Sequence, residues 1–168
     1  MSALHEIASA VRIRRGEMGL SQQKLAALSG LSRTTVNRLE QGSIADLSIQ
    51  RTSRLLDVLG IHLQVADGGV RRQKPAATMT ALERAALSAG ISFKRRIGGA
   101  PLRRVLSGKD VPEAWIAHVR AFLEDAPVSL LADVAAQLER EDGLARTTTW
   151  ARMRELATWM GSTRDIWS

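Results

Sequence analysis

The 168-residue chain contains no cysteine and only three histidines, His5, His62 and His118. Without cysteine, a disulfide framework and a zinc site of the usual cysteine and histidine type are both excluded. No stretch approaches the roughly 18 apolar residues that span a bilayer, and the N-terminal residues lack the features of an export signal. These absences favour a cytoplasmic protein that is not inserted in a membrane and that holds no metal and no cofactor.

What the chain has in excess is positive charge. Its 24 Lys and Arg residues outnumber its 17 Asp and Glu residues, which gives a formal net charge of +7. This balance favours a polyanionic partner, either nucleic acid or an acidic protein surface. With 45% hydrophobic residues, the chain can also build the core of one ordinary domain or two small ones.

A stretch of small, basic and turn-forming residues interrupts the regular apolar spacing near the middle of the chain. It reads DGGVRRQKPAATMT, and we place a linker there over residues 68–79. The linker separates a first domain, residues 1–67, from a second domain, residues 80–168.

Apolar residues in both domains recur every three to four positions, which is typical of amphipathic helices. In the first domain this spacing predicts helices over residues 4–18, 22–29 and 33–41, and a further helix that stops at Gly60. In the second domain it predicts about five helices, separated by glycine and proline.

The stretch LSQQKLAALSGLSRTTVNRLEQG predicts two short helices joined by a tight turn. Ser21 and Ser32 are suited to cap the two helices, and Gly30 is suited to a left-handed turn between them. Val36 and Leu39 of the second helix then face the core. The residues left outside, near the start of that helix, are Arg33, Thr34, Asn37 and Arg38.

These exposed side chains match the base edges of the major groove of DNA. Arginine can donate two hydrogen bonds to guanine, asparagine can bridge adenine, and threonine offers a hydroxyl and a methyl group for thymine. The exposed helix face is therefore a candidate surface for reading DNA sequence.

The pattern L-S-Q-x-x-L-A-x-x-x-G-L-S-x-x-T-V-x-R-L-E-x-G resembles the helix-turn-helix of the Cro/C1 repressor family, and the likeness extends over roughly residues 4–66. It implies a mainly α protein with an N-terminal lambda-repressor-like bundle and one short β-strand, here followed by an all-α C-terminal domain. Glu40 in this pattern orients or stabilises the helix end. The implied base contacts are Arg33, Thr34, Asn37 and Arg38, and the implied phosphate contacts are Arg15, Gln22 and Ser32.

The segment IHLQV alternates apolar and polar residues and predicts a short β-strand with Ile61, Leu63 and Val65 on one face. A lone strand has no partner within the domain, so the simplest partner is the same strand of a second subunit. A helix that runs into such a strand is similar to the antitoxin subgroup of this family, in which the strand pairs between subunits. The resemblance implies a homodimer on a palindromic operator in double-stranded DNA.

The second domain resembles no family, and its most distinctive feature is a run of cations without an intervening acid. Such a run could add phosphate contacts, bind an acidic partner such as a toxin, or form a solvated basic face. The cations are Lys94, Arg95, Arg96, Arg103, Arg104 and Lys109.

Three functions are compatible with these features. The leading hypothesis is a sequence-specific DNA-binding transcriptional regulator, acting as a repressor. The alternative is an antitoxin whose helical half neutralises a toxin while its first half autoregulates the operon. A ligand sensor is a third option, although the sequence shows no pocket.

Catalysis is not expected, because no nucleophile motif, phosphate-binding glycine loop or metal-ligand spacing accompanies His118. We expect this histidine to lie on the surface. Helical spacing places the tryptophans Trp115, Trp150, Trp159 and Trp167 mostly in the core. Because it lies near the end of the chain, Trp167 must either tuck back or meet another chain.

Overall fold

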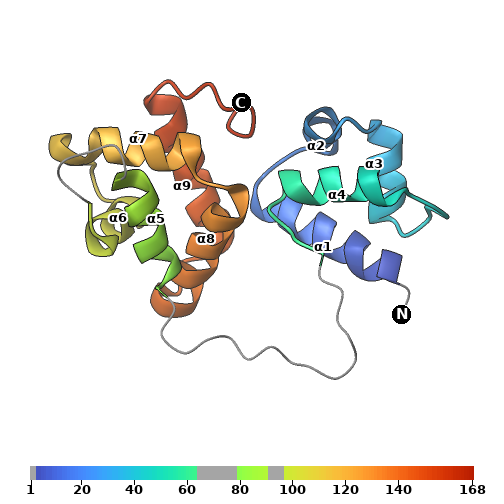
Figure 1. The fold of residues 1–168 in the computed structure, drawn as a ribbon, viewed down its shortest axis with the longest axis horizontal. Helices are drawn as coiled ribbons and strands as arrows, with labels where there is room; N and C mark the ends of the chain where they lie inside the picture. The colour runs from blue at the N-terminus through green and yellow to red at the C-terminus, as the bar shows by residue number, and fades with distance from the viewer. Residues whose placement is uncertain (1–2, 64–78, 91–96) are drawn as a thin grey trace.

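The computed structural model of the protein describes residues 3–63, 79–90 and 97–168, and within them the regular structure is helical. Two groups of helices lie side by side, and we call them the N-terminal and C-terminal domains (Figure 1). The N-terminal domain consists of α1 (Ala3–Glu17), α2 (Gln22–Ser29), α3 (Arg33–Glu40) and α4 (Ile49–Val58). The C-terminal domain consists of α5 (Ala81–Gly90), α6 (Gly99–Leu106), the 3-10 helix η1 (Glu113–Trp115), α7 (Ile116–Asp125), α8 (Val128–Asp142) and α9 (Arg146–Trp159).

The mainly α fold that the sequence predicts is confirmed, and the helices of the N-terminal domain begin and end within two residues of the predicted positions. Among the described helices, none has the length and apolar character that a membrane crossing requires.

The core of the N-terminal domain is built from apolar residues that all four helices contribute. Val11 of α1, Leu25 of α2 and Leu55 of α4 have no exposed surface. Val36 and Leu39 of α3 are equally buried, as their spacing predicts. Because these two side chains hold α3 against the core, the opposite side of that helix faces outward.

The predicted β-strand is not seen in the described residues. Ile61 and Leu63 follow α4 as irregular chain, and Val65 lies outside the described residues. A strand needs a second backbone beside it, and the described residues offer none here. Ile61 instead packs partly against the core, whereas the Leu63 side chain is 55% exposed. The predicted linker also lies outside the described residues, except for its last position.

The C-terminal domain contacts the end of α1 through α9. Arg146 forms an ion pair with Glu17 at 3.2 Å, and Arg154 donates a hydrogen bond to the backbone carbonyl of Met18. The buried apolar side chains of both domains belong to one cluster. The two domains are therefore joined by packing as well as by polar contacts, and α3 lies on the side away from α5–α9 (Figure 1).

Three of the four tryptophans are at least half-buried. Trp150 and Trp167 are 1% and 5% exposed, and their rings pack at a centroid distance of 5.9 Å. Trp167 tucks back and donates its indole N–H to the carbonyl of Leu123 at 3.1 Å, so it is not a free partner site. Trp115 is half-buried, but Trp159 is 61% exposed, and the prediction that it lies in the core is wrong.

The prediction of a surface position for His118 is also wrong. Its side chain is 4% exposed, and its ring packs edge-on against Trp115 at a centroid distance of 5.2 Å. His118 follows Trp115 by three residues and precedes Phe122 by four, so all three share the core-facing side of the chain there.

Candidate nucleic-acid interface

Three local features of the sequence form the corner between α2 and α3. Ser21 caps α2, since its hydroxyl accepts a hydrogen bond from the Lys24 backbone N–H at 3.0 Å. Gly30 has φ +69°, a left-handed conformation that glycine adopts without strain. Ser32 caps α3 by accepting a hydrogen bond from the Thr35 backbone N–H at 3.0 Å. The corner therefore forms at the residues that the sequence indicates.

The outer face of α3 carries the four candidate base-contact residues. Arg33, Thr34 and Arg38 are exposed, and Asn37 is half-buried. Within the part of the chain that the structure describes, the guanidinium groups of Arg33 and Arg38 have neither an ion pair nor a hydrogen bond. Their donors are therefore available to a ligand that approaches this face.

Four side chains from three helices form a chain of hydrogen bonds next to this face. Arg15 of α1 donates to both carboxylate oxygens of Glu40, from Nε at 2.6 Å and from Nη2 at 3.0 Å. Its Nη1 donates to the Leu20 carbonyl at 2.7 Å. Gln22 of α2 donates from Nε2 to Glu40 at 2.9 Å and to Asn37 Oδ1 at 3.3 Å. We call Arg15, Glu40, Gln22 and Asn37 the polar relay.

Glu40 is the centre of the polar relay, and its side chain is only 4% exposed. Burial by itself raises the pKa of a carboxyl group, because it disfavours the charged form. Here hydrogen bonds from Arg15 and Gln22, together with nearby arginine charge, outweigh burial, and the pKa of Glu40 is lowered. The carboxylate therefore stays charged and ties the end of α3 to α1 and α2.

The comparisons with known proteins agree with this geometry. Residues 11–65 match the model of the helix-turn-helix family, and the match includes the corner and α4. The N-terminal domain is a Cro/C1-type helix-turn-helix domain. This assignment supports DNA binding and transcription regulation. The C-terminal domain matches no family model, and no curated protein or solved structure matches the chain.

Two of the three candidate phosphate contacts in this helix-turn-helix domain direct their donors inward. All three side-chain nitrogens of Arg15 donate within the domain, and the Gln22 amide nitrogen has two acceptors. Ser32 is exposed, but its hydroxyl is bonded to Thr35. These residues thus have clear roles in building the domain, and their phosphate contacts stay predictions. Glu40 stabilises the helix end, as its place in the pattern implies.

Arg12 is a candidate site residue that the sequence pattern did not single out. It is exposed on α1, and its charge is close enough to lower the pKa of Glu40. An exposed guanidinium beside α3 is suited to a DNA phosphate. The available signal was helical spacing, because Arg12 lies three residues before Arg15 and shares its side of the helix.

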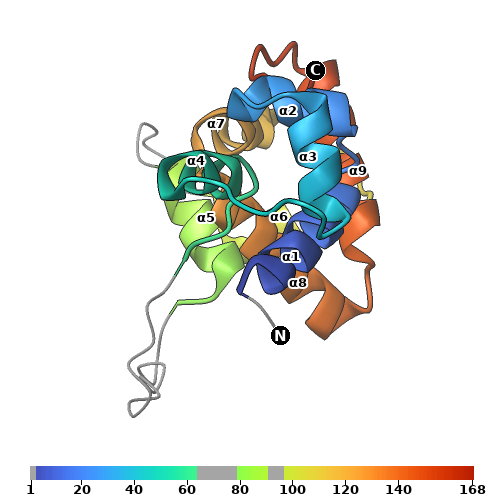
Figure 2. The same cartoon turned by 90° about the vertical axis from the view of Figure 1, so that its right-hand side faces the viewer.

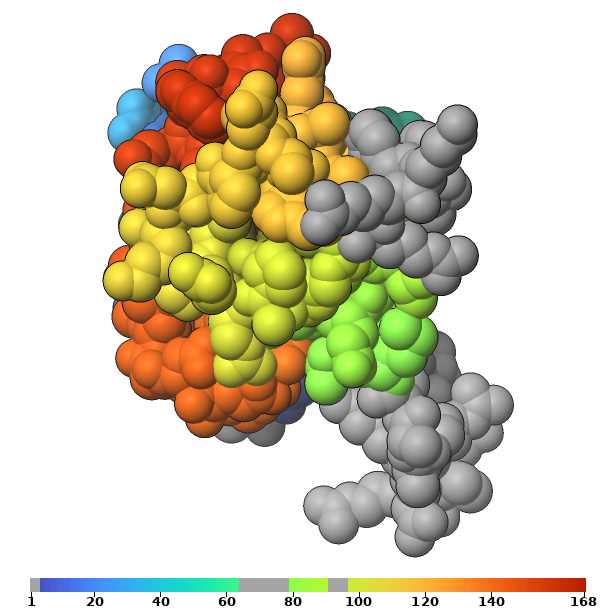
Figure 3. All heavy atoms as spheres, turned by 90° about the vertical axis from the view of Figure 1, so that its left-hand side faces the viewer, coloured from blue at the N-terminus to red at the C-terminus, as the bar shows by residue number. Residues whose placement is uncertain are grey.

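The candidate accessory basic patch is only partly described. Lys94, Arg95 and Arg96 lie outside the described residues, whereas Arg103 and Arg104 lie on α6. This helix forms the middle of the surface that faces away from the helix-turn-helix domain (Figure 3). Arg103 and Arg104 therefore lie at the opposite end of the described structure from α3 (Figure 1).

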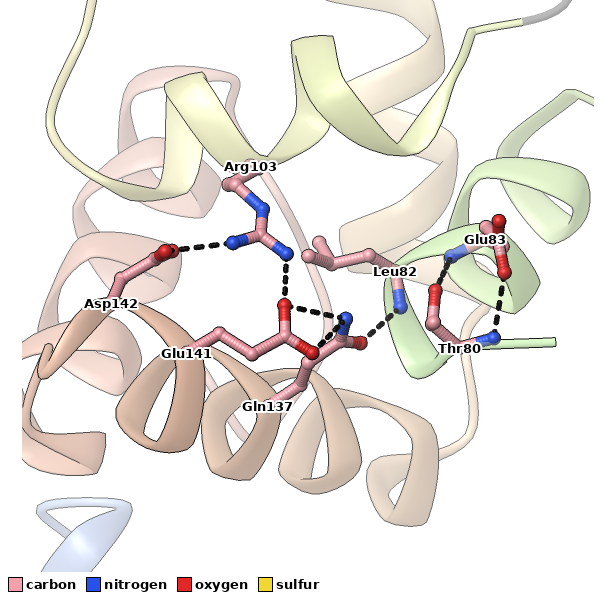
Figure 4. Close-up of polar contacts among 7 residues, drawn as sticks. All are labelled: Thr80, Leu82, Glu83, Arg103, Gln137, Glu141 and Asp142. Atoms are coloured by element: carbon pink, nitrogen blue, oxygen red, sulfur yellow. Dashed lines mark hydrogen bonds and ion pairs between the residues drawn. The ribbon is translucent and has the colours of Figure 1, made fainter. Parts of the chain in front are cut away.

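Arg103 is also neutralised by acids that the local sequence does not reveal. It forms ion pairs with Glu141 and, at 2.7 Å, with Asp142, both at the end of α8 (Figure 4). In the sequence these acids follow Arg103 by almost forty residues, but the fold brings them together. The described part of the patch therefore carries both positive and negative side chains and is not purely cationic.

Proposed function

We propose that the protein is a cytoplasmic transcriptional repressor that binds a palindromic operator in double-stranded DNA as a homodimer. The observation that carries the proposal is the outer face of α3. There, Arg33 and Arg38 are exposed and have no ion pair within the described residues. Viewed from its outer side, the helix-turn-helix domain presents α3 in front of the C-terminal domain, so a duplex can approach it (Figure 2).

Exposed apolar side chains on the same domain support the homodimer. Ile49, at the start of α4, is 82% exposed, and Leu63, after the end of α4, is 55% exposed. Contact with a second copy would remove this apolar surface from water. A two-fold axis would also place the two α3 helices about 34–36 Å apart, which is one turn of DNA and requires a palindromic site.

The test is a binding selection on random duplex DNA with the full-length protein, followed by sequencing of the retained duplexes. We expect a palindrome with half-sites one helical turn apart, and a light-scattering mass of two chains per duplex. The double variant Arg33→Ala/Arg38→Ala should recover no motif. An unenriched pool from the wild-type protein would reject DNA reading, and one chain on a single half-site would reject the homodimer. A reporter gene placed behind the selected site then distinguishes repression from activation.

The second candidate function is that of an antitoxin, in which the C-terminal domain binds and neutralises a toxin. The observation that favours it is Trp159, a large aromatic side chain that is 61% exposed on α9. Exposed tryptophans are enriched at protein interfaces, where they contribute much of the binding energy. Neither function involves a catalytic step.

Coexpression of the full chain with the product of the adjacent gene tests the antitoxin function. The wild-type chain should restore growth and copurify with that product, whereas Trp159→Ser should do neither. If the wild-type chain and the Trp159→Ser variant restore growth equally well, Trp159 is not part of the contact with the toxin. An adjacent product that is harmless by itself would reject the antitoxin function and leave the repressor proposal intact.

A further inference from the structure

Building on the homodimer of the proposed function, we infer that a second copy of the chain binds to the outer face of α4. In this contact Arg54 pairs with Asp57 of the partner subunit, and Asp57 pairs with Arg54 of the partner subunit. The exposed Ile49 and Leu63 indicate an interface, but by themselves they do not determine how two copies are aligned in it. The alignment follows from the charges that lie between them.

The outer face of α4 consists of four exposed residues that recur at the spacing of one side of a helix. They are Gln50, Ser53, Arg54 and Asp57. The opposite side of α4, which includes Leu55 and Leu56, is buried in the core. Figure 2 shows α4 and α3 on different sides of the N-terminal domain. A copy that binds to α4 therefore leaves the exposed face of α3 open.

Arg54 and Asp57 carry opposite charges that are not paired within one chain. They lie about one turn apart on α4, at a spacing that allows an ion pair, but neither forms one within the described part of the chain. A face with both charges is complementary to itself, because a copy related by a two-fold axis offers an aspartate to the arginine and an arginine to the aspartate. The outer face of α4 is thus suited to bind its own copy.

The charges also select the relative direction of the two helices. If two copies of α4 lie parallel, each charge is beside the same charge of the partner subunit, and the contact is repulsive. If they lie antiparallel, Arg54 faces Asp57 at two symmetric places. The antiparallel arrangement is therefore the one in which all four charges are paired.

The same antiparallel alignment brings the exposed apolar residues together. Ile49 precedes Arg54 by five residues, and His62 follows Asp57 by five, so Ile49 comes to lie beside His62 and Leu63 of the partner subunit. Ile49 is 82% exposed and Leu63 is 55% exposed in one chain. The contact removes both from water, once at each end of the paired helices.

The charged and apolar residues have different roles in this contact. An exposed ion pair adds little affinity, whereas like charges brought face to face oppose association strongly. Ile49 and Leu63 therefore supply most of the affinity, and Arg54 and Asp57 determine the alignment. Reversing a charge is consequently a sharper test than removing it.

The test measures the mass of the full-length protein by sedimentation over a range of concentrations. Arg54→Asp brings two aspartates face to face at both contacts, and Asp57→Arg brings two arginines face to face. Each variant alone should have a dimer dissociation constant at least about tenfold above that of the wild type. Arg104→Asp is the matched control, because Arg104 is exposed on α6, and it should dissociate like the wild type.

Mixing the two charge-reversal variants isolates the contact between subunits. A heterodimer of Arg54→Asp with Asp57→Arg again pairs an aspartate with an arginine at both contacts. The mixture should therefore form dimers with about the dissociation constant of the wild type. An ion pair within one helix could not recover on mixing, since each chain would keep its two like charges.

The outcomes separate this interface from the function on which it rests. A wild-type protein that stays a single chain at every concentration overturns the homodimer, and the interface with it. A wild-type dimer that both variants retain overturns the interface but leaves the homodimer standing, and so do variants that dissociate and do not recover on mixing. If a charge-reversal variant does not fold, Ile49→Ser decides instead, because Ile49 is outside the core. It should dissociate more readily, and a dissociation constant equal to that of the wild type would overturn the interface.

Discussion

The guanidinium of Arg15 binds both carboxylate oxygens of Glu40, at 2.6 and 3.0 Å, although the two residues are 25 positions apart in the sequence. The pair is largely shielded from water, with 20% and 4% of the two side chains exposed. It joins the first helix of the domain, α1, to the end of α3. Loss of one partner would leave a charge in a site that water does not solvate well.

We expect Arg15→Met to lower the free energy of unfolding by about 3 kcal/mol, the low end for removing one partner of a buried ion pair. Arg12→Met is the matched control, because Arg12 is exposed on the same helix. Its effect should stay within about 0.5 kcal/mol. Urea unfolding of the two variants measures both values. Equal losses would show that the Arg15 contact contributes no more than a surface charge.

The lowered pKa of Glu40 predicts a stability that depends on pH. Its pKa in the folded protein lies below the ordinary value of 4.5, because hydrogen bonds from Arg15 and Gln22 help to outweigh burial. The group therefore contributes stability above about pH 4.5, and this contribution is lost as the pH falls through the folded pKa. Urea unfolding of wild type and Glu40→Gln should show a difference that is constant near neutral pH and shrinks in acid. A difference that grows below pH 4.5 would contradict the sign of the shift.

The proposed DNA-facing role of α3 predicts that Arg33→Ala and Arg38→Ala each weaken binding to the selected site by about 1–3 kcal/mol and relax specificity at one position. Arg104→Ala is the matched control, since Arg104 is also exposed but lies on α6, away from α3. It should leave both the affinity and its salt dependence unchanged. Titration at two salt concentrations measures these quantities. A reduced salt slope for Arg104→Ala would instead place α6 on DNA.

Two glycines with the same backbone conformation report on the contact between the domains. Gly30 and Gly60 have φ of +69° and +63°, so alanine at either position is strained by about 1–2 kcal/mol. A Cβ at Gly30 would meet nothing within 4 Å, but at Gly60 it would lie 2.4 Å from the backbone nitrogen of Ser129 in α8. Gly60→Ala should therefore lower the free energy of unfolding by about 1–3 kcal/mol more than Gly30→Ala. Similar losses in urea unfolding would mean that α8 moves aside without cost.

The sequence predicts those features of the fold that are determined within one or two helical turns. Ser21, Gly30 and Ser32 identify the corner because a cap or a left-handed turn depends on the residue itself and its nearest neighbours. The polar relay was not predictable in this way. Gln22 and Glu40 meet only after α2 and α3 have packed, so no local spacing shows that their donors and acceptors are already paired.

The incorrect predictions also have physical causes. Ile61 and Leu63 alternate as a strand does, but alternation does not supply the second backbone that a strand requires. Trp159 follows Trp150 by nine residues, which is about two and a half turns of an α-helix, so the two side chains lie on opposite sides of α9. Of the two tryptophans on α9, helical spacing applied strictly places Trp150 in the core and Trp159 outside it.

Trp167 and Trp159 therefore provide a final pair of variants in which the same residue type has opposite environments. Trp167 packs against Trp150 and donates to the Leu123 carbonyl, whereas Trp159 is 61% exposed. Trp167→Ala should lower the free energy of unfolding by about 3–5 kcal/mol through the cavity that it leaves. Trp159→Ala should change it by no more than about 0.5 kcal/mol. Thermal and urea unfolding measure both values in the full chain. A small loss for Trp167→Ala would mean that the end of the chain is not held against α7 and α9 in solution, because a detached indole would leave no cavity when it is removed.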